Sequence, residues 1–155
     1  MKLKRPLVIF ALAVLAIGIR IALADSVLES EGDNAQVLRV AVKPSKTRVR
    51  IKEPFKVQLL VENPTPAIQH VRMMNCSWYD CWKTSNQQIL FGGWDCDKNF
   101  AVTVDIVPGG AWTNELDMYI PKPISQDKLS FKMGFAPIGS PKTYWSDSVD
   151  IEILP

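Results

Sequence analysis

From residue 37 onward, the chain alternates apolar and polar residues with a period of two. The clearest stretch runs from Phe55 to Glu62, where Phe55, Val57, Leu59 and Val61 share one face. Such alternation is typical of a strand with one buried face, because successive side chains of a strand point to opposite sides. No segment of this region keeps a 3.6-residue period, so its core is expected to be free of helix.

The same pattern recurs between turn clusters such as Asn63–Pro66, Pro108–Gly110 and Pro121–Pro123. Phe100 and Trp145 are assigned to the inward faces of their strands. Evenly spaced short strands favour a sandwich or a barrel. We therefore predict an all-β domain over residues 37–155, a two-sheet sandwich of seven to eight antiparallel strands. The candidate segments are Leu38–Lys43, Arg48–Ile51, Phe55–Glu62, Ile68–Met74, Phe100–Ile106, Trp112–Ile120, Leu129–Phe135 and Trp145–Ile153.

Three segments carry a resemblance to known proteins. The stretch Phe55–Asn63, the hairpin around Pro108-Gly109 and the closing segment Tyr144–Ile153 resemble bacterial exported immunoglobulin-like modules. The resemblance implies an immunoglobulin-like fold and names no activity. The Cys…Trp…Cys spacing of antibody domains across two core strands is absent, so a true immunoglobulin domain is not implied.

The first 24 residues have the three parts of a secretory signal peptide. Lys2, Lys4 and Arg5 precede an apolar run of 14 residues, and Ala22-Leu23-Ala24 matches the small-x-small cleavage pattern before Asp25. The run is shorter than the ~20 residues that span a bilayer as a helix. An uncleaved anchor is the alternative, although it would bury Arg20 in the membrane. We predict cleavage after residue 24, a flexible lead-in over 25–36, and a periplasmic or secreted protein.

The charge balance changes when the signal is set aside. Residues 1–24 hold four of the 18 basic residues and none of the 16 acidic ones, which leaves 14 basic residues against 16 acidic ones. A mildly acidic domain with mixed charges lacks the basic footprint of a nucleic-acid binder. It also lacks the polybasic cluster that binds a membrane surface. The expected partner is therefore a protein.

Residues 75–99 depart from the strand rhythm and hold all three cysteines of the chain, Cys76, Cys81 and Cys96. Cysteines of an exported protein tend to oxidise, and three of them allow one bridge with one thiol left over. Loop closure favours Cys76–Cys96, with Cys76–Cys81 and Cys81–Cys96 as alternatives. The remaining thiol would be buried and inert, or paired with another chain.

The same insert carries a group of aromatic residues. One interpretation is that they fill a satellite core under the loop, since Trp and Tyr are mostly buried. The other is that they form a partner-binding surface, since these residues anchor interfaces and loops carry function. The partner-binding candidates are Trp78, Tyr79, Trp82 and Trp94.

The sequence offers no catalytic constellation and no cofactor motif. His70 is the only histidine, with no nucleophile motif near it, and Asp95 and Asp97 form a D-x-D pair without the other ligands of a calcium loop. Soft ligands gather over a short stretch, which leaves copper(I) binding as an alternative to core packing and a disulfide. These ligands are His70, Met73, Met74, Cys76 and Cys81.

Three functional hypotheses follow. The first is an exported, non-enzymatic β-sandwich that binds a macromolecule or serves as an accessory subunit in the cell envelope. The second is a secreted inhibitor that blocks a protease or a cell-wall hydrolase with the insert. The third is a copper-handling protein. No catalytic, cofactor or metal residues are assigned under the first hypothesis.

Overall fold

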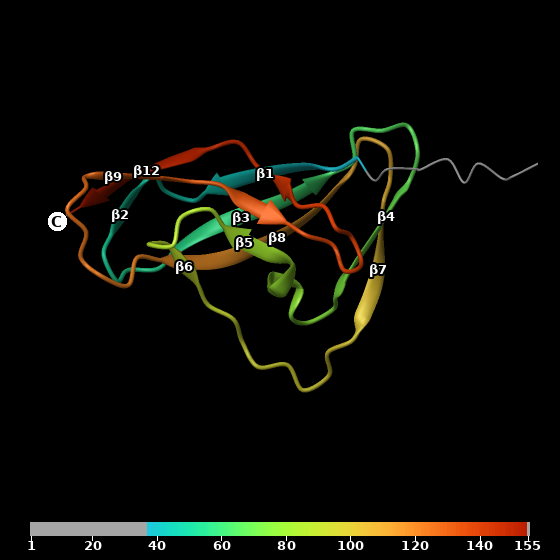
Figure 1. Cartoon of the computed structure of the whole chain (residues 1–155), viewed down its shortest axis with the longest axis horizontal. Coiled ribbons are helices and arrows are strands. Elements are labelled where there is room, and N and C mark those ends of the chain that lie inside the picture. The colour runs from blue at the N-terminus through green and yellow to red at the C-terminus, as the bar shows by residue number, and fades with distance from the viewer. Residues whose placement is uncertain (1–36, 155) are drawn as a thin grey trace, which may run out of the picture. The chain divides into compact units, whose positions relative to one another are not determined.

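The computed structural model describes residues 37–154 (Figure 1). The predicted signal peptide and the lead-in up to residue 36 lie outside this range. Within it, the chain forms twelve strands and one short 3₁₀ helix, and it contains no helix with the length and hydropathy of a membrane span. The elements are β1 (Arg39–Pro44), β2 (Arg48–Arg50), β3 (Phe55–Glu62), β4 (Gln69–Met74), η1 (Trp78–Cys81), β5 (Trp82–Thr84), β6 (Leu90–Phe91), β7 (Ala101–Ile106), β8 (Ala111–Tyr119), β9 (Lys128–Phe131), β10 (Met133–Phe135), β11 (Tyr144–Trp145) and β12 (Val149–Leu154).

These strands form four small sheets. The largest has the order β1-β3-β8-β6, and two three-stranded sheets have the orders β11-β10-β5 and β2-β12-β9. The fourth sheet pairs β4 with β7 alone. The all-β prediction is confirmed for residues 37–154, but the strands do not form the predicted two-sheet sandwich. They are also not all antiparallel, because β2 pairs with β12 in parallel.

A change of partner explains why more strands and sheets occur than predicted. The run Leu129–Phe135 is one apolar face in sequence, yet it is split at Lys132 into β9, which pairs with β12, and β10, which pairs with β5 and β11. At the break, the Lys132 N–H donates to Ser85 Oγ at 2.8 Å, and the Ser85 N–H donates to the Lys132 carbonyl at 2.9 Å. Alternation specifies which face of a strand is buried, but not its partner or direction.

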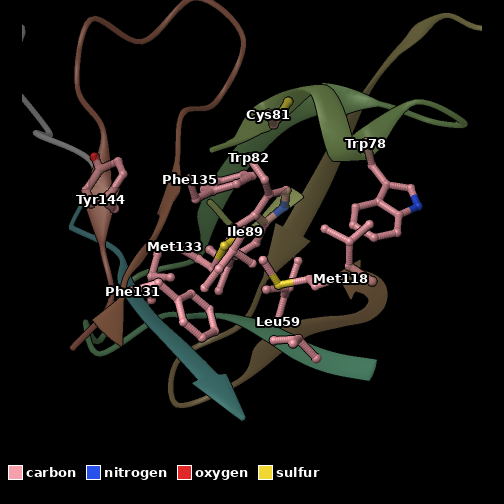
Figure 2. Close-up of a cluster of buried hydrophobic side chains, with 14 of the residues drawn as sticks. Leu59, Trp78, Cys81, Trp82, Ile89, Met118, Phe131, Met133, Phe135 and Tyr144 are labelled. Atoms are coloured by element: carbon pink, nitrogen blue, oxygen red, sulfur yellow. The ribbon is translucent and has the colours of Figure 1, made fainter. Parts of the chain in front are cut away.

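The hydrophobic core collects the apolar faces that alternation predicted. In β3, Val57, Leu59 and Val61 are completely buried, and in β8 Leu116 and Met118 are buried beside them. Figure 2 shows Leu59 and Met118 gathered around the same space as Phe131, Met133 and Phe135. The core therefore lies between the β1-β3-β8-β6 sheet and the strands β9, β10 and β5.

Two residues assigned to inward faces are exposed instead. Phe100 is 59% exposed, because it precedes β7 and lies opposite Asn75, beyond the buried stretch of β4. Trp145 is 44% exposed, while its neighbour Tyr144 is buried. The expected single strand is broken at residues 146–148, so the face of Trp145 is not linked to that of Val149.

Asn63 joins three parts of the domain at the end of β3. Its side chain is buried, and its Nδ2 donates to the carbonyls of Ala67 and Ile106, both at 2.8 Å. Its Oδ1 accepts from the Thr65 N–H and hydroxyl. All side-chain groups of this buried amide are therefore paired, which fixes the β4–β7 sheet to the end of the largest sheet.

Candidate partner-binding surface

The insert, residues 75–99, is partly built into the sheets. Its first half contains η1 and β5, which pairs with β10, and its strand β6 pairs with the edge of β8. Ile89 between them is completely buried. Residues 92–100, in contrast, contain no strand, and we call this segment the tether loop. The expectation that the whole insert stands apart from the strand rhythm is therefore wrong for its first half.

A disulfide joins the two ends of the insert. Cys76 and Cys96 are bonded, with their Cα atoms 6.0 Å apart, as loop closure favoured. Cys81 is the free thiol and is buried. Burial raises the pKa of the Cys81 thiol, so the thiolate is disfavoured and the side chain is a poor nucleophile. Of the two roles open to the third cysteine, the buried one fits this position.

Polar contacts reinforce the base of the tether loop. The buried Ser77 receives a hydrogen bond on its Oγ from Asn99 Nδ2 at 2.7 Å and donates its own N–H to Asn99 Oδ1 at 3.2 Å. Asn75 Oδ1 accepts from the Phe100 N–H at 3.0 Å. Together with the disulfide, these hydrogen bonds fix the two chain segments at the base of the loop relative to each other.

The four aromatic candidates divide between core and surface. Trp78 and Trp82 are buried, Tyr79 is half-buried, and Trp94 is 44% exposed. Their rings form a continuous series from the surface to the core. The ring centroid of Trp78 lies 5.5 Å from that of Trp94 and 5.5 Å from that of Trp112. The ring centroid of Trp82 lies 6.4 Å from that of Trp112 and 5.1 Å from that of Phe135.

Trp112 is a member of this series that sequence reasoning missed. It comes from β8, well outside the insert, and the alternation of the predicted strand Trp112–Ile120 places it on the apolar face with Leu116 and Met118. Its edge-to-face contact with Trp78 connects the insert to the largest sheet. The inward face was a usable signal, but nothing in the sequence indicated that the insert would fold over this end of β8.

Trp94 is held in place through its backbone by a single side chain. The Tyr79 hydroxyl donates to the Trp94 carbonyl at 2.6 Å and accepts from the Trp94 N–H at 3.3 Å. The two rings also meet edge-on, with centroids 4.4 Å apart. Gly93 permits this approach, because a Cβ at that position would lie 2.7 Å from the Tyr79 ring. The indole of Trp94 is therefore presented from a fixed backbone.

Trp82, in contrast to Trp94, is a core residue. It is buried beside Phe135, and its Nε1 is the one buried side-chain nitrogen or oxygen in residues 37–154 that has no hydrogen-bond partner. An unpaired buried donor costs about 1–3 kcal/mol. Trp82 thus contributes apolar volume to the core and no side-chain hydrogen bond.

The residues considered for metal binding or catalysis are not brought together. Cys76 is in the disulfide, Met73 is buried in the core, and Met74 lies on the other face of β4. His70 Nδ1 lies 2.6 Å from Asp105 Oδ1 on the exposed face of the β4–β7 sheet. Within the described part of the chain, no three His, Cys, Asp or Glu side chains form a group that could hold a metal ion.

Comparisons with known proteins do not identify a family. No family model and no curated protein matches the chain. Two solved structures are similar over part of their length, each 12% identical. One is the alkylpurine DNA glycosylase AlkC of Pseudomonas fluorescens bound to DNA containing an abasic-site analogue, with a TM-score of 0.38 over 77% of this chain and 31% of that one. The other is the sporulation control protein Spo0M of Bacillus subtilis, with a TM-score of 0.41 over 76% of this chain and 49% of that one. This chain spans less than half of either protein, and similarities this weak support no argument about function.

Proposed function

We propose that this protein is an exported, non-enzymatic binding module that recognises a macromolecular partner, most simply a protein, through the tether loop. Its role would be that of an accessory subunit of the cell envelope. The observation that supports the proposal is the presentation of Trp94. Its ring is close to half exposed while its backbone is held by Tyr79 and its loop is closed by the Cys76–Cys96 disulfide.

A rigid, exposed tryptophan is well suited to partner recognition. Trp is among the residues most enriched at the energetic centres of interfaces. Ordering a flexible side chain or loop on binding lowers affinity, and a surface that is already ordered avoids that loss. Phe100, 59% exposed on the same loop, supplies a second apolar side chain for such an interface.

Trp145 provides a matched control for this proposal. It has the same exposed fraction as Trp94, 44%, but lies on β11, outside the insert. The ammonium of Lys83 lies over its ring at 5.3 Å, so part of that ring is already covered. Because the two tryptophans are equally exposed in different surroundings, comparing their variants distinguishes specific binding from nonspecific hydrophobic adsorption.

The test is partner capture from the envelope fraction of the source organism with three proteins: the unmodified one, W94A and W145A. We expect W94A to weaken capture of a saturable partner by at least ~30-fold, the effect of losing about 2 kcal/mol at an interface centre. W145A should change it by less than about threefold. Equal loss in both variants, or none in W94A, would reject the tether loop as the binding surface.

The captured partner also separates the two roles the loop could have. An accessory subunit leaves the activity of its partner intact, whereas an inhibitor suppresses the activity of a protease or cell-wall hydrolase in the same complex. Measuring the activity of the complex with the unmodified protein, and again with W94A, decides between them.

A further inference from the structure

The strand β7 is open along the whole of one edge. Among residues 37–154, β7 pairs only with β4. Natural proteins protect sheet edges by keeping them short, by placing Lys or Pro on them, or by covering them, because an open edge can pair with another chain. β7 has six residues, Ala101 to Ile106, and contains no basic residue and no proline.

The other terminal strands of the four sheets each carry such protection. β6 and β11 have two residues each, and β2, β5 and β9 have three or four and include a lysine or arginine. β1 ends in Lys43-Pro44. β4 is as long as β7, but the N–H of Ile138 covers it by donating to the Arg72 carbonyl at 2.8 Å. In Figure 1, β7 (yellow) lies at the rim of the described domain.

The direction of the free backbone groups follows from three hydrogen bonds. The Phe100 carbonyl accepts from the Asn75 N–H, and the Ile106 carbonyl accepts from Asn63 Nδ2, so even-numbered residues turn their backbone groups toward β4 and its flanks. The Arg72 carbonyl faces Ile138 and not its pair partner Thr103. Because backbone groups alternate along a strand, Ala101, Thr103 and Asp105 direct their N–H and C=O groups to the open edge.

We propose that β7 is a homodimer interface, in which two copies of this chain pair their β7 strands antiparallel about a two-fold axis at Thr103. This register uses all three outward-facing residues. Thr103 pairs with Thr103 of the second copy, and Ala101 pairs with Asp105 at each end. Each of these is a pair that exchanges two backbone hydrogen bonds.

The side chains of β7 match this register. The central segment reads the same in both directions, Val102-Thr103-Val104, so each Val102 lies opposite a Val104 of the other copy. Pairs of β-branched residues and Thr–Thr pairs are favourable across antiparallel strands, whereas like charges directly opposite are not. The only charge in β7, Asp105, lies opposite an alanine. Self-pairing therefore suits this strand better than it would suit a strand with a central charge.

The dimer would leave the tether loops accessible. Each tether loop leads into the N-terminal end of its own β7 at Phe100, and antiparallel pairing places the two N-terminal ends at opposite ends of the interface. Val102 and Val104, both half-buried, would lie on the inner side of a continuous four-stranded sheet, β4-β7-β7-β4. The proposal is independent of partner binding, since it depends only on the β7 edge.

Sedimentation equilibrium of the purified protein across a wide concentration range tests the interface. We expect a reversible dimer. We also expect T103P to raise the dissociation constant of the dimer at least tenfold more than T103S does. Proline at 103 removes an outward N–H without removing a bond to β4, so thermal unfolding of T103P should stay cooperative. A monomer at all concentrations, or a T103P protein that folds and still dimerises, would overturn the proposal.

Cysteine cross-linking tests the register separately. In the proposed register, Thr103 lies directly opposite its own copy at the ~5.5 Å Cα separation of a hydrogen-bonded pair, which a disulfide can bridge. Two Ala101 residues would be too far apart. T103C should therefore form a covalent dimer under mild oxidation and A101C should not. Equal cross-linking of the two variants would indicate random collision and reject the register.

Discussion

Two consecutive segments of the insert region, residues 76–91 and residues 92–100, have similar aromatic content but different positions in the molecule. Residues 76–91 contain Trp78 and Trp82, and both rings are buried where η1 and β5 pack on the core. Residues 92–100 contain Trp94 and Phe100, and both are exposed. The difference lies in backbone pairing: the first segment contributes two strands to neighbouring sheets, and the second segment has none. Aromatic content alone does not distinguish a core segment from a recognition loop.

The largest expected effect comes from truncating one tryptophan in each segment. W82A should lower the free energy of unfolding by about 3–5 kcal/mol, because it leaves a large cavity beside Phe135 and Trp112. W94A should cost about 1 kcal/mol, since its ring is half exposed and contributes mainly edge contacts. Denaturant titration of both variants measures the difference. Equal losses would show that the tether loop belongs to the core as much as β5 does.

Removing the covalent link between the segments should have the next largest effect. C76S/C96S should lose about 2–4 kcal/mol of stability, the usual range for a native bridge. It should also release the backbone around Trp94, which hydrogen exchange of residues 92–100 would detect, while β5 keeps its protection. If exchange in the loop were unchanged, the polar contacts of Asn75, Ser77 and Asn99 would be sufficient to hold it.

The contact between the segments can be disturbed without touching an aromatic residue. G93A places a methyl group 2.7 Å from the Tyr79 ring, whereas G92A meets nothing within 4 Å and serves as its control. We expect G93A to cost about 1 kcal/mol, to lower the steady-state anisotropy of Trp fluorescence, and to weaken partner capture. A G93A protein that matches G92A in all three measurements would show that Tyr79 does not hold Trp94.

The smallest effect concerns the free thiol of the first segment. Burial raises the pKa of Cys81, so its thiol stays neutral in the native state at a pH where the unfolded chain ionises it. The associated stability is fully present below the ordinary thiol pKa, and it is lost as the pH rises from that pKa through the raised pKa of the folded state. Relative to C81A, the unmodified protein should lose less than about 1 kcal/mol between pH 7 and pH 9.

The reactivity of Cys81 gives a direct check of the same point. A thiol reagent at pH 8 should modify Cys81 only as fast as the protein opens, and rapidly in denaturant. Fast modification of the native protein would place Cys81 at the surface and contradict the assignment of η1 to the core.

Much of the fold follows from local pattern. Alternation identified the buried faces of β3 and β8, and cysteine spacing favoured the Cys76–Cys96 bridge that the structure contains. Both depend on short-range physics: side-chain direction along a strand, and the entropy of closing one loop. The predicted signal peptide belongs to the same class of inference and remains a prediction, since residues 1–36 lie outside the described range.

The tertiary structure decided what local pattern leaves open. Strand partners are chosen by long-range packing, so the split of Leu129–Phe135 between two sheets and the parallel β2–β12 pair were not predictable from alternation. The same holds for the placement of Trp112 beside Trp78, and for which of the insert's tryptophans reach the surface. A sequence specifies which groups need burial and pairing, but only the assembled sheets determine that β7 keeps an unpaired edge and that Trp94 remains exposed on a fixed loop.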